Sequence, residues 1–171
     1  IGIDAAQVAG GAAGANGGFL LAGSARFYHQ MRQSVGREAA RRLYLLTVQE
    51  IERMTLDMPD LVRRVGSLRI AMSPEELVNC EEQFTGMQNH GLPVERYDGP
   101  EGRGLLIPTD GVFNPLARCR RLAARCLQRG ARLFEHSAAL EVRSGLVRTA
   151  QGSIRCKHII AAIDGKLELL F

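Results

Sequence analysis

The chain has 171 residues, of which 46% are hydrophobic, and a formal net charge of +4. This length and apolar content suffice for one or two small globular domains and exclude a wholly disordered chain. No apolar run reaches the roughly 20 residues that span a bilayer, and the N-terminus lacks a secretory signal pattern, so we expect a cytoplasmic protein without a membrane span.

The positive charge does not indicate a nucleic-acid partner. Nucleic-acid-binding domains concentrate lysine and arginine in a patch or stripe, whereas here the arginines are spread along the predicted helices and strands among acidic residues, and only 5% of residues are aromatic. The four cysteines form no CxxC pair, which argues against a zinc site and against a disulfide framework. We therefore expect neither nucleic acid nor metal as a ligand.

The N-terminal third combines a strand end, a glycine-rich loop and long helices. Residues 1–4 have the pattern of the end of a strand, with Asp4 as its last residue. Residues 8–23 hold too many glycines for the interior of a helix or strand. Apolar residues then recur near helical spacing over residues 25–58, and Gly36 is placed to break this region into two helices.

The middle third begins with a strand and a well-marked helix. Residues 65–72 alternate as a strand does. Ser73 is followed by proline and, three residues later, by Glu76, which predicts a helix start and an end near Gly91. Glycines and prolines punctuate residues 93–108, which predicts short strands.

The last third begins with a second helix and ends in β-prone runs. Asn114 and Pro115 predict a helix start, and the apolar pattern carries the helix to Gly130. Short strands are predicted over residues 132–136, 140–143, 146–150 and 154–163. The final run, 158–163, is apolar throughout, as expected for a parallel strand that is covered on both faces.

Asp4 occupies a chemically suggestive position. In a dinucleotide-binding βαβ unit, an acid at the end of the second strand binds the ribose hydroxyls, and a GxGxxG turn precedes it. No such turn precedes Asp4, and the glycines at 14–18 come after it. Taken alone, Asp4 is better explained as an exposed acid at a strand end, because one acid without its glycine fingerprint is a weak signal, and the loop could be a flexible connection.

No catalytic constellation stands out in the sequence. The histidines, His29, His90, His136 and His158, fall in different predicted elements, which favours surface positions or satisfied core positions. Arg26, Tyr28 and Arg37 could reach a carboxylate substrate, although solvated helix-face residues are the favoured interpretation.

Several blocks along the chain resemble the family of FAD-dependent oxidases that includes D-amino-acid oxidase, glycine oxidase and sarcosine oxidase. The blocks are residues 3–6, 11–18, 108–115, 130–133, 147–149, 152–154 and 159–165. They occur in the family's order across nearly the whole chain, and that joint order is more specific than any single block.

The resemblance implies FAD as the cofactor and assigns roles to matching positions. Asp4 would bind the adenosine ribose, Val142 would offer backbone groups near the adenine, and Ala162 to Gly165 would line the pyrophosphate side. The loop would lie along the flavin and pyrophosphate, with Gly11, Gly14, Asn16, Gly17 and Gly18 as its cofactor-binding residues. Glycines permit this close approach of the backbone.

The resemblance also implies an α/β fold, with a Rossmann-type FAD-binding domain and an inserted α+β substrate-domain segment. Residues 1–65 and 109–171 would belong to the FAD-binding part and residues 66–108 to the substrate domain. The parent enzyme would oxidise the C–N bond of a small amine or amino acid, and flavin would carry the redox chemistry. The alternative is a truncated, non-catalytic fragment or an interaction module that needs a partner chain. The sequence leaves open whether the protein forms a homo-oligomer.

Overall fold

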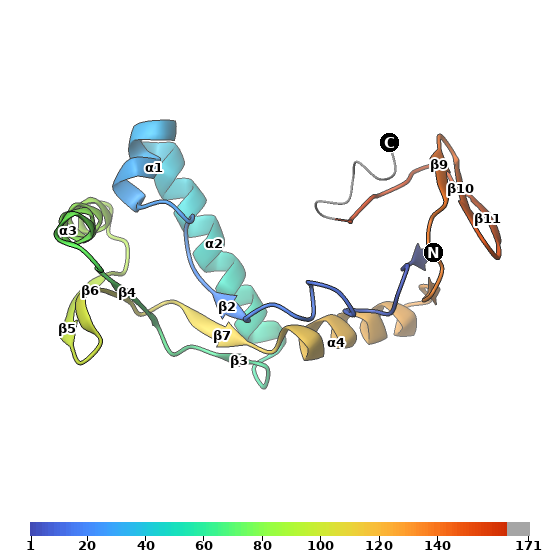
Figure 1. Cartoon of the computed structure of the whole chain (residues 1–171), viewed down its shortest axis with the longest axis horizontal. Coiled ribbons are helices and arrows are strands. Elements are labelled where there is room, and N and C mark those ends of the chain that lie inside the picture. The colour runs from blue at the N-terminus through green and yellow to red at the C-terminus, as the bar shows by residue number, and fades with distance from the viewer. Residues whose placement is uncertain (164–171) are drawn as a thin grey trace. The chain divides into compact units, whose positions relative to one another are not determined.

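The computed structural model describes residues 1–163, and the chain folds as two compact units that we treat separately. Unit 1 comprises Ile1–Asn16 and the described part of Pro115–Phe171, and unit 2 comprises Gly17–Asn114. The helices and strands of both are labelled in Figure 1. The predicted cofactor residue Gly165 lies outside the described residues.

Unit 2 contains three helices and two small antiparallel sheets. Its elements are β2 (Phe19–Leu20), α1 (Tyr28–Val35), α2 (Arg37–Asp57), β3 (Val62–Arg63), β4 (Ser67–Ile70), α3 (Pro74–Gln88), β5 (Glu95–Gly99), β6 (Gly102–Ile107) and β7 (Gly111–Phe113). One sheet has the strand order β2-β7-β3 and the other β4-β6-β5. In the second sheet Arg69 of β4 lies opposite Leu105 of β6.

The helix boundaries in unit 2 confirm the sequence prediction. Gly36 has φ of 83° and separates α1 from α2, because this left-handed conformation suits glycine and interrupts a helix. Ser73 caps α3, since its Oγ accepts a hydrogen bond from the Glu76 N–H at 3.2 Å. Within residues 1–163, no helix combines the length and apolar composition of a membrane span.

Three clusters of buried apolar side chains form the core of unit 2. The largest joins α1 and α2 to α3 and β6 and contains Tyr28, Ala40, Tyr44, Val48, Met87, Leu92 and Ile107. Met87 and Leu105 are fully buried. Because this cluster crosses the predicted boundary at residue 65, the long helices belong to the same compact unit as the 66–108 segment. Which unit carries which function stays a prediction.

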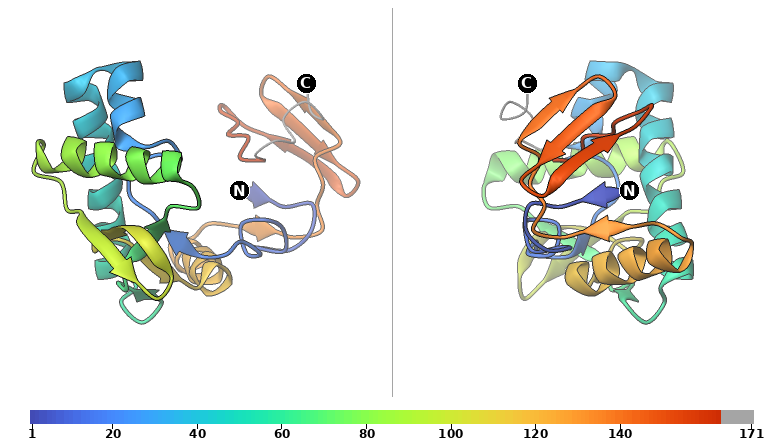
Figure 2. Two further views of the ribbon diagram at one scale, coloured as in Figure 1. Left: turned by 60° about the vertical axis from the view of Figure 1, so that its left-hand side comes forward. Right: turned by 90° about the vertical axis from the view of Figure 1, so that its right-hand side faces the viewer.

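Unit 1 contains one helix, a pair of parallel strands and a three-stranded meander. Its elements are β1 (Gly2–Ile3), α4 (Pro115–Gln128), β8 (Leu133–Phe134), β9 (Glu141–Arg143), β10 (Leu146–Thr149) and β11 (Gly152–Arg155). β1 pairs with β8 in parallel. The meander has the order β11-β10-β9, and Figure 2 shows its three antiparallel strands side by side.

The predicted strand over residues 154–163 is wrong for most of its length. β11 ends at Arg155, and residues 158–163 form no strand. Ile160 is 91% exposed. An apolar parallel strand is stable only between neighbouring strands, and the two described parallel strands, β1 and β8, pair with each other and not with this run.

Candidate functional site

Asp4 lies at the carboxyl end of β1, where a parallel strand presents its last side chain. Its backbone N–H donates to the Phe134 carbonyl at 2.9 Å, which ties it to the end of β8. The side chain is exposed, and Oδ1 accepts a hydrogen bond from the Ala6 N–H at 2.8 Å. Within residues 1–163, Oδ2 has no hydrogen-bond partner. The carboxylate is therefore held in place, and its second oxygen is able to accept hydrogen bonds from hydroxyl groups, as ribose recognition requires.

The loop after Asp4 closes into a single turn over residues 11–15. The Ala15 N–H donates to the Gly11 carbonyl at 3.2 Å, and the Asn16 side-chain amide donates to the carbonyls of Ala12 and Ala13 at 3.1 and 3.0 Å. The N–H groups of Gly11, Ala12 and Ala13 donate to no group in the described part of the chain. Successive free N–H groups of this kind can bind phosphate or flavin oxygens.

Two glycines of this loop differ in what they permit. A Cβ on Gly14 would lie 2.1 Å from the Ala9 carbonyl oxygen, so glycine is required here by the packing of the loop itself. A Cβ on Gly11 would have no heavy atom within 4 Å. Gly11 therefore faces open space, where a ligand could approach the backbone closely.

Gly17 and Gly18 begin unit 2 and lead into β2. Gly18 is buried with φ of 67°, and its carbonyl accepts a hydrogen bond from the Phe113 N–H at 2.8 Å. A Cβ on Gly17 would lie 2.8 Å from the Phe19 ring. Local packing thus accounts for glycine at both positions, and their role toward a cofactor stays a prediction.

Val142 and Ala162 are placed in different surroundings. Val142 is half-buried in β9, opposite Val147 of β10. Ala162 is exposed and follows the meander outside any strand. Asp4 is linked to the segment before β9, because its carbonyl accepts a hydrogen bond from the Ser137 N–H at 2.8 Å. The structure therefore connects Asp4 to the approach to β9, whereas it shows no contact of Asp4 with Val142 or Ala162 among the described residues.

Unit 2 contains a cavity of about 470 Å³ that the sequence analysis did not predict. The segment after β2, the helices α1 and α2, and the strands β4 and β6 contribute to its wall. The lining residues are Leu21, Ala22, Gly23, Ser24, Ala25, Arg26, Tyr28, Met31, Ala40, Leu43, Tyr44, Thr47, Ser67, Leu68, Arg69, Gln83, Ile107 and Asp110. Apolar walls with a few polar groups are typical of small-molecule sites, and this volume is in their usual range.

Asp110 fixes one part of this wall. It is only 2% exposed, and Oδ1 accepts a hydrogen bond from the Ala22 N–H at 2.9 Å while Oδ2 accepts one from Ser67 Oγ at 2.6 Å. The buried carboxylate therefore holds the segment after β2 against the first residue of β4. The sequence signal for this role was the turn 109–111, which by itself does not reveal the two partners.

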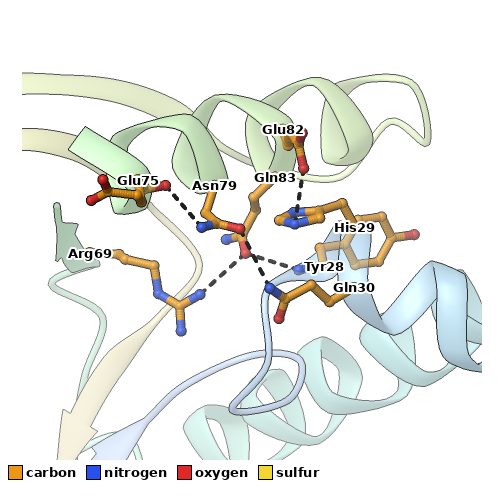
Figure 3. A network of polar contacts seen from close by, with 8 residues as sticks. All are labelled: Tyr28, His29, Gln30, Arg69, Glu75, Asn79, Glu82 and Gln83. Atoms are coloured by element: carbon orange, nitrogen blue, oxygen red, sulfur yellow. Dashed lines mark hydrogen bonds and ion pairs between the residues drawn. The ribbon is translucent and has the colours of Figure 1, made fainter. Parts of the chain in front are cut away.

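Gln83 of α3 organises a second part of the wall, shown in Figure 3. Its Oε1 accepts hydrogen bonds from the Tyr28 N–H at 3.0 Å and from Arg69 Nη1 at 3.3 Å. Gln83 is 7% exposed, so this side chain connects the first turn of α1 to β4 inside the unit. The strand pattern of residues 67–70 already places Ser67 and Arg69 on one face, and this was the available signal.

Tyr28 is not the solvated helix-face residue that the sequence favoured. It is 5% exposed, and its hydroxyl makes a short hydrogen bond with His90 Nδ1. Burial, followed by the charges of Arg37 and Arg32, lowers the pKa of His90 below its usual value. Tyr28 is buried because the first turn of α1 packs on both α2 and α3.

The other residues considered for a carboxylate substrate and the remaining histidines do not form one site. Arg26 lines the cavity, whereas Arg37 is exposed at the start of α2. His29 lies 3.1 Å from a Glu82 carboxylate oxygen. His136 is exposed in unit 1. No group of three or more histidine, cysteine or acidic side chains in residues 1–163 has the geometry to hold a metal ion.

Comparison with solved structures identifies the fold. Glycine oxidase from Geobacillus kaustophilus superposes with a TM-score of 0.64 at 20% identity, covering 91% of this chain and 46% of that one. L-amino acid deaminase from Proteus vulgaris superposes with a TM-score of 0.63 at 16% identity, covering 90% of this chain and 39% of that one. L-proline dehydrogenase from P. horikoshii superposes with a TM-score of 0.61 at 17% identity, covering 72% of this chain and 38% of that one. The chain spans less than half the length of these structures, and the predicted α/β fold of the FAD-binding type is confirmed.

The family assignment comes from the sequence. The family model described as DAO, FAD dependent oxidoreductase, matches residues 1–170. The chain belongs to this family of FAD-dependent oxidoreductases, as the resemblance indicated. No protein of curated function matches it.

Proposed function

We propose that the protein containing this chain oxidises the C–N bond of an amine or amino acid with FAD as its cofactor. The family is one of FAD-dependent oxidoreductases, and the similar structures are an oxidase, a dehydrogenase and a deaminase of amino acids by name. The observation that carries the proposal for this chain is the position of Asp4, an exposed and oriented carboxylate at the carboxyl end of a parallel strand.

The residues of unit 1 fit the adenosine and pyrophosphate parts of FAD. Asp4 would accept hydrogen bonds from the ribose hydroxyls through Oδ2, while the Ala6 N–H keeps the carboxylate oriented. The free N–H groups at the start of the 11–15 turn would donate to phosphate or flavin oxygens. We further propose the predicted roles for Val142 at the adenine and for Ala162 and Gly165 at the pyrophosphate.

The glycine-rich loop extends in sequence to Gly17 and Gly18, which belong to the predicted flavin-binding residues. Here we propose that Gly14, Asn16, Gly17 and Gly18 shape the backbone that lies along the flavin. The packing of Gly14 on the Ala9 carbonyl and of Asn16 on the preceding turn supports a fixed loop conformation. A fixed loop binds a ligand with less loss of conformational entropy.

When bound, FAD supplies the acceptor for the electrons removed from the substrate. The protein then has to bind the substrate, orient its C–N bond and exclude water, and no acid–base pair is required of the residues described. We assign the segment 66–108, which contributes β4, α3 and β6 to the wall of the cavity in unit 2, to the substrate side of the enzyme.

Replacing Asp4 tests the cofactor proposal. The experiment uses the natural protein that contains this chain, freed of flavin and titrated with FAD while flavin absorption and fluorescence are recorded. Asp4→Asn removes the charge that accepts the ribose hydroxyls, and we expect the Kd for FAD to rise by roughly tenfold or more, as for a lost hydrogen bond to a charged group. Asp98→Asn is the matched control, because Asp98 is an exposed acid of β5 in unit 2, and this variant should keep the wild-type Kd.

Two results would contradict the proposal. Equal affinity of Asp4→Asn and wild type for FAD would remove Asp4 from the cofactor site. A colourless protein that is indifferent to FAD and inactive toward amines and amino acids would instead favour an interaction module over an oxidoreductase.

A further inference from the structure

Three arginines of unit 2 meet where α1, the start of α2 and the end of α3 pack together. Arg32 lies in the last turn of α1, and Arg37 and Arg41 are one turn apart on α2, so they share a face of that helix. Arg41 Nε donates to the His90 carbonyl at 3.3 Å. A Cβ on Gly86 of α3 would lie 3.2 Å from Arg32 Nη1, which places this guanidinium over α3, four residues before His90. These three arginines are called the arginine cluster below.

The charges of the arginine cluster are not neutralised by ion pairs within the described part of the chain. No carboxylate of residues 1–163 lies within ion-pair distance of Arg32, Arg37 or Arg41, whereas Arg53, further along α2, pairs with Glu50. Like charges that are held near one another repel, so an anion between them would be bound favourably. Arg37 and Arg41 are exposed, and an anion can therefore reach them from solvent.

Positive charge prevails at the imidazole beside the arginine cluster. Burial and then the charges of Arg37 and Arg32 lower the pKa of His90. Arg41 adds to this effect, whereas Glu38, which is exposed in the first turn of α2, acts in the opposite sense. Because a positive potential disfavours the imidazolium form, the lowered pKa agrees with guanidinium groups that face His90.

The imidazole of His90 offers a buried donor that has no partner. His90 is 7% exposed, and its Nδ1 makes a short hydrogen bond with the Tyr28 hydroxyl. Burial raises the pKa of Tyr28, so the phenol keeps its proton and donates it to Nδ1. The proton of the neutral imidazole is then on Nε2, which is directed away from Tyr28 and has no hydrogen-bond partner in residues 1–163. A buried N–H without an acceptor is unfavourable, and a ligand oxygen would satisfy it.

Further unpartnered donors lie beside this imidazole. Arg32 Nε is buried and has no partner within residues 1–163. The helix α2 begins after Gly36, and no side chain caps the N–H groups of its first turn. A Cβ on Gly36 would have no heavy atom within 4 Å, so this end of the helix is open. The positive end of the helix dipole and the guanidinium groups favour the same ligand, a compact anion with several acceptor oxygens.

From these observations we propose that the arginine cluster and the start of α2 bind a dianionic tetrahedral oxyanion of the phosphate type. Arg37 and Arg41 are its donors on the solvent side, and Arg32 and His90 are its donors on the inner side. The oxyanion is either free phosphate or the phosphate group of a small phosphomonoester, since both present the same oxygens. The proposal goes beyond the cofactor site, because it concerns unit 2 alone.

The first test determines which anions bind. The natural protein that contains this chain is titrated by calorimetry with inorganic phosphate, methyl phosphate or acetate at constant ionic strength, so that general screening is the same for all three. Saturating FAD occupies the proposed cofactor site during the titration. We expect phosphate or methyl phosphate to bind at least roughly tenfold more tightly than acetate. If neither binds more tightly than acetate, the proposal is overturned.

The same titration separates the two sources of the phosphate group. Tighter binding of methyl phosphate identifies a phosphomonoester as the ligand, and tighter binding of inorganic phosphate identifies the free anion.

The second test replaces the exposed arginines of the cluster. Arg37→Gln and Arg41→Gln each remove one guanidinium near solvent, and we expect the Kd for phosphate to rise roughly three- to tenfold in each. Arg41→Lys keeps the charge and should retain part of the affinity, which also covers a folding defect of the glutamine variant. Arg53→Gln is the matched control, because it removes one charge from the same helix about 24 Å from Arg37 and should keep the wild-type Kd. Unchanged affinity in both cluster variants would contradict the assignment.

A third measurement detects the anion at His90. Sulfate is the probe, because it stays dianionic over the pH range in which histidine titrates. A dianion beside the ring favours the imidazolium form, so the pKa of His90, followed by NMR of histidine-labelled protein, should rise when sulfate replaces chloride at constant ionic strength. His90→Gln assigns the signal, and His136, exposed in unit 1, is the control whose pKa should not change. A pKa of His90 that does not respond to sulfate would contradict its place in the site.

The anion site and the proposed cofactor site can fail independently. Failure of FAD binding, with the effect of the arginine variants on phosphate binding intact, would refute the cofactor and leave this site standing. Phosphate binding that is present without FAD and lost with saturating FAD would instead assign the anion to the cofactor site and overturn this proposal.

Discussion

The two units of the chain differ in how much of their interior is buried. Unit 2 has three clusters of buried side chains, with Met87 and Leu105 fully buried. In the described part of unit 1 only Val147 is buried, and α4 buries no residue. Unit 2 is therefore stabilised by apolar burial, whereas the predicted cofactor residues lie mostly in a unit with little core of its own. A ligand that binds unit 1 should stabilise it by a free energy that grows with the logarithm of the ligand concentration divided by Kd.

The largest expected effect contrasts the two cores directly. Leu105→Ala removes a fully buried side chain from the cluster with Cys80 and Phe84, and we expect the free energy of unfolding to fall by about 2–5 kcal/mol. Val147→Ala in unit 1 should cost about 1–2 kcal/mol, because less apolar surface is lost. Urea unfolding followed by circular dichroism measures both. A larger loss for Val147→Ala would break the comparison.

A smaller effect concerns the loop of unit 1. Alanine at position 14 would place its Cβ 2.1 Å from the Ala9 carbonyl, so the turn must rearrange, and we expect its amides to exchange roughly tenfold faster. Gly11→Ala is the matched control, since nothing lies within 4 Å of the added Cβ, and its exchange rates should stay near those of the wild type. Hydrogen exchange followed by NMR distinguishes the two. Equal behaviour of both variants would show that the loop is not fixed by its own packing.

The smallest effect is a pH dependence in unit 2. The pKa of His90 is lowered from its ordinary 6.5 by burial and then by the charges of Arg37 and Arg32. The unfolded chain therefore binds the proton more readily, so this contribution to stability is fully present above pH 6.5 and is lost as the pH falls toward the folded-state pKa. His90→Gln removes the titrating group, so the free energy of unfolding of this variant should depend less on pH across this range than that of the wild type. A wild type and variant with parallel pH profiles would contradict this account.

The elements with strong local signals were predictable from the sequence. The break at Gly36, the cap at Ser73 and the helix start at Pro115 depend on backbone conformation and hydrogen bonds within a few residues, which the local sequence determines. The strand prediction for residues 158–163 was wrong, because an apolar pattern indicates burial but does not show whether neighbouring strands are present. The sequence pattern alone therefore predicted the helices better than the parallel strand.

The candidate sites divide in the same way. The position of Asp4 at the end of a strand was predictable, because the strand and the acid are adjacent in the sequence, and its role toward a cofactor stays a prediction. The cavity in unit 2 was not, because it depends on contacts between distant segments: Gln83 binds the Tyr28 N–H, and Asp110 binds the Ala22 N–H. The exposed character expected for Tyr28 was wrong for the same reason, since its burial comes from packing with Tyr44 and His90.

Hydrogen exchange with and without FAD tests the central claim most directly, that the dinucleotide is bound through unit 1. We predict that FAD slows exchange in the peptides that contain Asp4, the 11–15 turn and Val142. This protection should be strongly reduced in Asp4→Asn, and α3 in unit 2 should be little affected. Protection confined to unit 2, or identical protection in wild type and Asp4→Asn, would contradict the account.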